Sequence, residues 1–263
     1  MVTFEPLPQA FFRPEQAPGR LLTVHQKLSC FRTAGVDLVW MMRFGKELAC
    51  LSARDFAEQV LISDMRAKCV VVGEDFRFGR GREGDVVMLQ QLGSAMGFAV
   101  ETVPIVESDG QRISSSRIRQ QLEAGNFQAA AAFLGRPYRM DGHVVQGANL
   151  GKKLGFPTAN LKIRAQPCPI QGVFAVFARS AGVGWRPGVC NLGWRPAVGG
   201  TEPLLEVHFF DFDKDLYGQR LEVQFVAKLR EELNFESIDE LVVQMQRDEA
   251  EARACLKQVT LPD

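Results

Sequence analysis

The stretch Gly151-Lys-Lys-Leu-Gly-Phe-Pro-Thr-Ala-Asn160 is the most informative part of this chain. Pro157 fixes its own φ and favours an extended backbone at Phe156, so the end of the stretch is expected to run as a strand. Side chains two residues apart in a strand point to the same side, so Thr158 and Asn160 share a face. Their hydroxyl and amide oxygens suit a Mg²⁺ ion whose other positions are filled by nucleotide phosphates and water. The alternative is a turn in which these two side chains make only local hydrogen bonds.

The glycine-containing segment 147–155 is expected to form a flexible loop in front of that strand. Gly151 and Gly155 let the backbone approach a phosphate closely, and Lys152 or Lys153 can supply positive charge. A Walker A loop is excluded, because only three residues separate the first two glycines and a lysine stands where that motif needs a hydroxyl for Mg²⁺. We therefore predict an ATP-phosphate site of another kind, made by Gly151, Lys152, Gly155, Thr158 and Asn160.

Further runs in the second half of the chain are short, rich in β-branched or aromatic residues, and separated by Gly, Pro or Asp turns. They span residues 173–178, 188–192, 204–210 and 221–226. Such spacing is typical of antiparallel β structure, either a barrel or a sandwich. After them, Ser237-Ile-Asp-Glu240 is a capping box that opens an amphipathic helix.

Glu206 is the candidate general base of this half. If residues 204–210 form a strand, Leu205 and Val207 face the core, and Glu206 shares the other side with His208. A carboxylate among apolar neighbours suits a group that takes a proton from an alcohol. Spacing alone favours an exposed glutamate on the solvent face over a general base, and it likewise favours His208 as a surface or packed strand residue.

The first half of the chain alternates helical and strand patterns, which indicates an α/β fold. Ser52-Ala-Arg-Asp55 resembles an N-cap with an acidic third position, ahead of a periodic helical stretch. Residues 69–73 predict a fully buried parallel strand and residues 98–103 the next strand. Helices are predicted for 85–96 and 114–134.

Residues 79–84 match the dinucleotide-binding pattern G-x-G-x-x-G. In that fingerprint the first glycine makes the turn directly after the strand. Here residues 74–78 intervene after Gly73. The match is therefore a weak indication of a dinucleotide fold, and we predict none.

Composition narrows the class of protein. The 263 residues carry 31 Lys+Arg and 31 Asp+Glu, so no global field attracts nucleic acid or an anionic membrane. The six cysteines form no C-x-x-C pair, which argues against a zinc site and predicts reduced thiols, most of them in the core. No apolar run approaches 18 residues, and no signal peptide is recognisable. We expect a soluble, cytoplasmic protein.

From about Leu134 onward the chain resembles the riboflavin kinase module of the bacterial bifunctional riboflavin kinase/FMN adenylyltransferase (FAD synthetase) family. The resemblance rests on residues 151–160, 188–193, 205–212 and 215–218. It implies a six-stranded antiparallel β-barrel with a C-terminal helix, riboflavin, ATP and FMN as substrates and product, and Mg²⁺ with the nucleotide. It further implies that Thr158 and Asn160 contact Mg²⁺–ATP and that Glu206 activates the riboflavin 5′-hydroxyl.

The first half resembles the adenylyltransferase module of the same family, a nucleotidyltransferase-like α/β fold, through residues 3–6, 71–79 and 113–119. We predict two modules, residues 1–134 and 135–263. The resemblance implies that Ser115, Ser116 and Arg119 contact ATP phosphates and that Asp75 contacts flavin or nucleotide. Hydroxyls and an arginine at a helix N-terminus suit an anion, although Ser114 to Ser116 could equally cap the helix that follows.

One departure from the family concerns its H-x-G-H nucleotidyltransferase motif. The histidines of the chain are His25, His143 and His208, and none has that spacing. We therefore expect an incomplete first module with impaired FAD synthesis, because the phosphate-stabilising imidazoles are absent from these residues. The alternatives are a fully bifunctional enzyme whose start was misassigned, and a flavin-binding protein without catalysis. The oligomeric state is left open.

Overall fold

The computed structural model describes residues 1–108, 110–147, 150–163, 167–197 and 200–262. The chain divides into two compact units. The first comprises Met1–Ala17 and Leu28–Ile113, and the second comprises Pro18–Lys27 and Ser114–Asp263. Each unit has an apolar cluster of its own.

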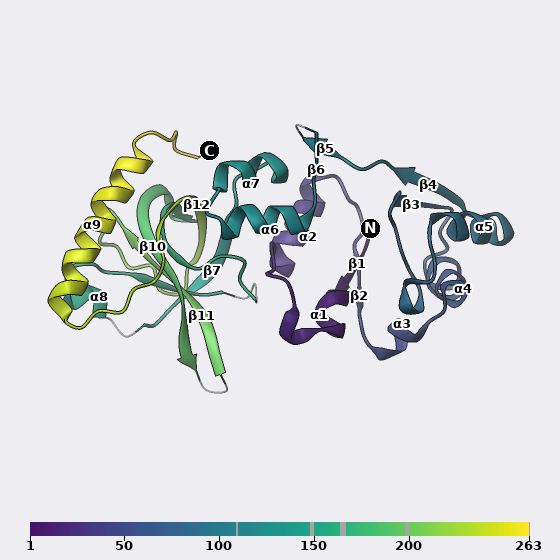
Figure 1. Ribbon diagram of the computed structural model, residues 1–263, viewed down its shortest axis with the longest axis horizontal. Coiled ribbons are helices and arrows are strands. Elements are labelled where there is room, and N and C mark those ends of the chain that lie inside the picture. Colours follow the sequence, from purple (N-terminus) through teal and green to yellow (C-terminus); the bar gives the residue numbers. More distant parts are fainter. Residues whose placement is uncertain (109, 148–149, 164–166, 198–199, 263) are drawn as a thin grey trace. The chain divides into compact units, whose positions relative to one another are not determined.

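The second unit is built on a closed antiparallel β-barrel (Figure 1). Its strands follow one another around the barrel in the order β10-β11-β8-β7-β12-β9. Their bounds are β7 Arg139–Val145, β8 Ala159–Lys162, β9 Gly172–Ser180, β10 Val183–Ala197, β11 Gly200–Phe209 and β12 Arg220–Arg230. The predicted strand runs therefore close into a barrel and do not form a sandwich.

The barrel interior holds the largest apolar cluster of the described residues. Leu205 and Val207 of β11 and Leu161 of β8 are fully buried in it, as the alternating pattern predicts. Two helices, α6 (Ser115–Glu123) and α7 (Phe127–Leu134), add Ile118, Leu122, Phe127 and Ala130 to the same cluster. The single helix predicted over residues 114–134 is wrong, because Gly125 adopts φ +76° and ends the first helix.

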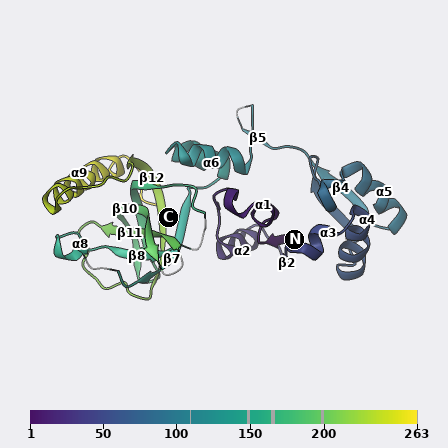
Figure 2. The same cartoon turned by 60° about the horizontal axis from the view of Figure 1, so that its bottom comes forward.

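Helix α9 (Ile238–Leu256) packs on the outer face of the barrel, along β9, β10 and β12 (Figures 1 and 2). It begins as predicted, since the Ser237 hydroxyl accepts a hydrogen bond from the Glu240 amide at 3.2 Å. Ala252 and Leu256 are buried against Phe177 and Phe210. A one-turn helix, α8 (Leu150–Lys153), precedes β8.

The first unit contains the predicted α/β elements (Figure 2). Strands β1 (Val2–Glu5) and β2 (Trp40–Arg43) pair in parallel, as do β3 (Cys69–Gly73) and β4 (Ala99–Val103), while β5 (Glu107–Ser108) and β6 (Gln111–Arg112) are antiparallel. The helices are α1 (Pro8–Phe12), η1 (Pro14–Gln16), α3 (Lys46–Cys50), α4 (Ala53–Asp55), the π-helical η2 (Phe56–Asp64), η3 (Arg80–Arg82) and α5 (Val86–Met96). Helix α2 (Val24–Thr33) runs across the division between the two units.

Two sequence expectations about burial are corrected. Strand β3 is not fully buried: Val70 and Val72 pack on an apolar cluster, whereas Val71 on the other face is 59% exposed. The reason is that, among the described residues, β3 pairs with β4 alone and is covered on one side. The cysteines are free thiols, but Cys190 alone is buried, whereas Cys50 and Cys69 are exposed.

The glycine-rich segment 79–84 forms a tight turn. Phe78 and Gly84 pair as an antiparallel bridge across it, and the Glu83 carboxylate accepts a hydrogen bond from the Ala53 amide at 2.8 Å. Gly79 has φ +76°, and a Cβ there would lie 2.6 Å from the Ala53 nitrogen. Gly79 therefore serves close packing of this turn against α4.

Candidate active site

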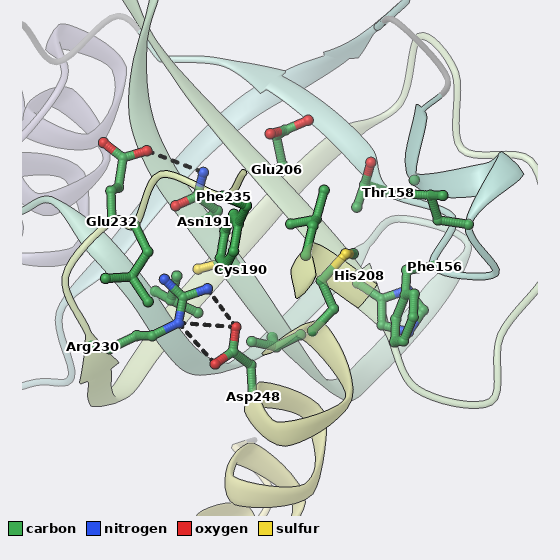
Figure 3. A pocket seen from close by; sticks show the side chains of 17 residues that line it. Phe156, Thr158, Cys190, Asn191, Glu206, His208, Arg230, Glu232, Phe235 and Asp248 are labelled. Carbon is green, nitrogen blue, oxygen red and sulfur yellow. Dashed lines mark hydrogen bonds and ion pairs between the residues drawn. The ribbon is translucent and has the colours of Figure 1, made fainter. Parts of the chain in front are cut away.

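The second unit has a cavity of about 290 Å³ on the outer face of its barrel (Figure 3). It lies against β10 and β11, and its other walls come from the segment after α8, the segment after β12, and α9. Its polar lining residues are Thr158, Asn191, Glu206, His208, Arg230, Glu232 and Asp248. Thr158 and Glu206, which the sequence singled out 48 positions apart, thus meet at one cavity.

Strand register explains how the predicted residues meet. Glu206 on β11 is the direct cross-strand partner of Asn160 on β8 and of Asn191 on β10. Direct partners in an antiparallel pair project from the same face, so these three side chains form a row. Figure 3 shows Glu206 between Asn191 and Thr158. The row lies on the outer face, because the neighbouring Leu205 faces the interior.

Asn160 is buried in this row and is not among the residues that line the cavity. Its side chain is 5% exposed, and its Oδ1 atom has no hydrogen-bond partner in the described part of the chain. Leaving a buried carbonyl oxygen unpaired costs about 1–3 kcal/mol unless a ligand or water meets it. A Cβ at Gly147 would lie 2.6 Å from this oxygen, so glycine lets the preceding loop pass directly over Asn160. Together with the Thr158 hydroxyl, this oxygen fits Mg²⁺ chemically.

The segment before β8 differs from the expected open loop. The amides of Leu154, Gly155 and Phe156 donate to carbonyls of Gly151 and Lys152 at 2.8–3.3 Å, so they are engaged within the segment. Of the three predicted phosphate-binding residues here, Gly151 lines the cavity, whereas Lys152 and Gly155 are not among its lining residues. Residues 148 and 149 of the predicted loop lie outside the described residues.

Arg230 and Asp248 form the opposite wall of the cavity, and sequence reasoning missed both. The Arg230 guanidinium donates to the Asp248 carboxylate at 2.6–3.1 Å (Figure 3). Gln244 donates to the same carboxylate at 2.8 Å. The two side chains are 19% and 5% exposed. The pair joins the end of β12 to α9. Nothing local in the sequence indicates it, because the two residues belong to different elements.

Glu232, also missed, anchors the segment after β12. Its carboxylate accepts hydrogen bonds from Gln171 at 2.7 Å and from Asn191 at 3.3 Å. A Cβ at residue 193 would lie 1.9 Å from the same carboxylate, so Gly193 leaves room for it. Asn191 thus connects the row beside Glu206 to this segment. Its Oδ1 is buried and has no hydrogen-bond partner among the described residues.

Cys190 lies on the cavity wall as a neutral thiol. It is 1% exposed, and burial raises the pKa of this thiol well above its ordinary value. A buried thiol with a raised pKa is a poor nucleophile. Its side chain packs in the apolar cluster of the barrel interior, because Cys190 stands directly opposite Val207.

The predicted adenylyltransferase residues lie in different units. In the first unit, Asp75 forms an ion pair with Arg112, which holds the pKa of this carboxyl below its usual value. In the second, Ser115 and Ser116 are exposed on the first turn of α6, and the preceding Ser114 caps that helix.

Arg119 uses one nitrogen of its guanidinium in a hydrogen bond within the second unit. Its Nε donates to the Gly19 carbonyl at 2.5 Å, and burial lowers the pKa of its guanidinium. Ser115, Ser116 and Arg119 thus share one helix, whereas Asp75 is described only with the first unit. In the residues that the structure covers, no helix is both long and apolar enough to cross a membrane.

Comparisons with known proteins cover both halves of the chain. The family model for riboflavin kinase matches residues 134–256, and the model for FAD synthetase matches residues 1–117. The chain is 42% identical over 253 residues to a bifunctional riboflavin kinase/FMN adenylyltransferase of Escherichia coli K12, covering 96% of this chain and 81% of that protein. The Pseudomonas fluorescens protein of the same name is 43% identical over 255 residues, with coverage of 97% and 81%.

A solved crystal structure, described as that of a macrolide-efflux protein from Streptococcus pneumoniae, has the same fold, with a TM-score of 0.76 and 30% identity. The match covers 96% of this chain and 82% of that one. The predicted fold, an α/β first half followed by a six-stranded antiparallel barrel with a C-terminal helix, is confirmed. The chain belongs to the bifunctional riboflavin kinase/FMN adenylyltransferase family.

Proposed function

We propose that the barrel unit transfers the γ-phosphoryl group of ATP to the 5′-hydroxyl of riboflavin, giving FMN and ADP, in the cavity beside Glu206. The observation that carries this proposal is the register of β8 and β11, which makes Glu206 the direct cross-strand partner of Asn160, whose Oδ1 has no hydrogen-bond partner among the described residues. A base beside hard oxygen ligands suits phosphoryl transfer to an alcohol. The riboflavin kinase model over residues 134–256 and the bifunctional relatives support it.

Three polar residues have roles in this proposal. The Glu206 carboxylate accepts the proton of the 5′-hydroxyl while O5′ bonds to the γ-phosphorus and the bond from that phosphorus to the β,γ-bridging oxygen breaks. Thr158 and Asn160 would hold Mg²⁺, which neutralises phosphate charge when bound with ATP. The protein contributes mainly positioning, since Glu206 and Asn160 stand on adjoining strands and Thr158 directly precedes the second of these.

The apolar part of the cavity is suited to the flavin ring system. Its walls include Val189, Leu233, Phe235 and Met245, which come from β10, the segment after β12, and α9. Small-molecule sites are typically apolar clefts with a few placed polar groups. With the ring on this side, the ribityl chain would extend toward Glu206 and bring its own terminal 5′-hydroxyl to that carboxylate.

We propose in addition that residues 1–134 form an FMN adenylyltransferase-like module and residues 135–263 the kinase module. The FAD synthetase match over residues 1–117 supports the former. Asp75, Ser115, Ser116 and Arg119 are its proposed flavin or nucleotide contacts. Residues 1–263 contain no H-x-G-H sequence. For a polypeptide of these residues we therefore expect slow adenylyl transfer, because imidazoles that stabilise the transferring phosphate are lacking.

A product assay separates these activities. Purified polypeptide of residues 1–263, incubated with riboflavin, ATP and Mg²⁺, is expected to accumulate FMN, with FAD far behind, as followed by HPLC. Conversion of FMN to FAD as fast as FMN is formed from riboflavin, so that FMN does not accumulate, would contradict the expected slow adenylyl transfer and favour full bifunctionality. Binding of riboflavin without any FMN would overturn the proposed kinase function.

The metal site predicts a loss of nucleotide binding on removal of either oxygen. Thr158→Val and Asn160→Ala should each weaken Mg·ADP binding at least about tenfold, since loss of even an outer-shell partner of a metal site costs about 10–100-fold. Isothermal titration calorimetry measures the affinity directly. Thr158→Ser keeps the hydroxyl and is the matched control, expected to bind close to wild type. Unchanged affinity in both Thr158→Val and Asn160→Ala would remove these residues from the site.

A further inference from the structure

His208 makes a contact that the proposed reaction does not use. It lies two residues after Glu206 on β11 and lines the same cavity. Its Nδ1 is 2.9 Å from the carbonyl oxygen of Pro157. Pro157 belongs to the segment that leads into β8, the strand paired with β11. A carbonyl can only accept a hydrogen bond, so Nδ1 carries the proton and the imidazole is the donor.

This hydrogen bond stands where the strand ladder stops. The paired residues of β8 and β11 end with Ala159 opposite Val207. Beyond that point Pro157 has no backbone N–H to continue the pairing. The side chain of His208 thus provides the next link between the two segments, directly beside Thr158.

The link restrains the direction of Thr158. The Pro157 carbonyl and the Thr158 amide belong to one planar peptide group, so holding the carbonyl holds the plane from which Thr158 departs. Proline already fixes φ on its own side of that plane. The imidazole is itself held, with its ring centroid 5.4 Å from that of Phe156 and 6.1 Å from that of Phe210, both in edge-on geometry.

We propose that His208 is a positioning residue for nucleotide binding, which orients the Thr158 hydroxyl through the Pro157 carbonyl. The proposal rests on the proposed role of Thr158 as a ligand of the metal-bound nucleotide. It predicts that the donor at Nδ1 matters more than the aromatic ring. It also predicts that His208 has no effect once the Thr158 hydroxyl is gone.

Paired substitutions separate the donor from the ring. His208→Phe keeps a ring and removes the donor, and it should weaken Mg·ADP binding and raise the KM for ATP about 2–10-fold, the worth of one net hydrogen bond. His208→Asn has an amide nitrogen at the position of Nδ1 and should stay close to wild type, whereas His208→Gln extends past it and should resemble His208→Phe. The KM for riboflavin should not change. His25→Phe, on the exposed surface of α2, is the control for loss of a histidine.

Two further readouts decide the outcome. In a double-mutant cycle of nucleotide binding, His208→Phe should add nothing in the Thr158→Val background, because its effect passes through that hydroxyl. In ¹⁵N NMR of the wild-type protein at high pH, the proton of the neutral imidazole should reside on Nδ1. Wild-type binding by His208→Phe, an additive cycle, or a proton on Nε2 would overturn the proposal. If the Thr158→Val variant binds Mg·ADP with wild-type affinity, the proposed role of Thr158 is wrong, and this result is distinct from a failure of the His208 proposal.

Discussion

Replacing Glu206 with glutamine is expected to lower kcat for FMN formation by about 10²–10⁴-fold, the usual contribution of a general base. Glutamine has nearly the shape of glutamate but cannot accept the proton of the riboflavin 5′-hydroxyl. The side chain stands in register between Asn160 and Asn191, so the substitution changes the chemistry of the row and little of its packing. Steady-state formation of FMN, measured at saturating riboflavin and Mg·ATP, gives the comparison.

The KM values distinguish lost chemistry from lost binding. If Glu206 acts on the proton alone, the KM for riboflavin and that for ATP stay within a few fold of wild type while kcat falls. Glu222→Gln is the matched control, because Glu222 also stands on a strand of the barrel but is not among the cavity-lining residues and pairs with Arg139 and Arg179. It should keep wild-type kcat. A Glu206→Gln enzyme with undiminished kcat would rule out this residue as the base.

Removing the Asp248 carboxylate is expected to lower the free energy of unfolding of the barrel unit by about 3–5 kcal/mol, the usual cost of breaking a buried ion pair from one side. In Asp248→Ala, the Arg230 guanidinium loses three hydrogen bonds of 2.6–3.1 Å to this carboxylate. The charge would stay largely out of water, since the Arg230 side chain is 19% exposed. Urea denaturation followed by circular dichroism measures the loss, with separate transitions fitted if the two units unfold separately.

Two comparisons test the origin of that loss. Glu231→Ala breaks the neighbouring ion pair to Lys228, in which the glutamate is 74% exposed, and should cost less than about 1 kcal/mol. The double variant Arg230→Met, Asp248→Leu replaces the pair by apolar side chains and should recover most of the stability. We expect this double variant to bind riboflavin more weakly than wild type even though its stability is recovered, because both residues line the cavity. Equal losses in Asp248→Ala and Glu231→Ala would contradict a special role for burial.

Local patterns in the sequence were sufficient for most of the elements. The cap at Ser237 and the strand of residues 69–73 lie where their residues predict. Burial was harder to predict than pairing, because exposure of Val71 depends on what lies above the strand. The break at Gly125 was missed, because a glycine inside a helical pattern can be tolerated or can end the helix, and the rest of the fold decides which.

The sequence by itself determined the α/β character of the first half and the run of strands in the second half, since residue types and short-range periodicity carry that information. The roles of Thr158, Asn160 and Glu206 came from the family resemblance and stay predictions. Only the tertiary structure decided that Asn160, Glu206 and Asn191 stand in one row and that Arg230 faces Asp248. The reason is physical: strand register and helix docking join residues far apart in the chain. A shift of one residue in register would turn Glu206 into the barrel core.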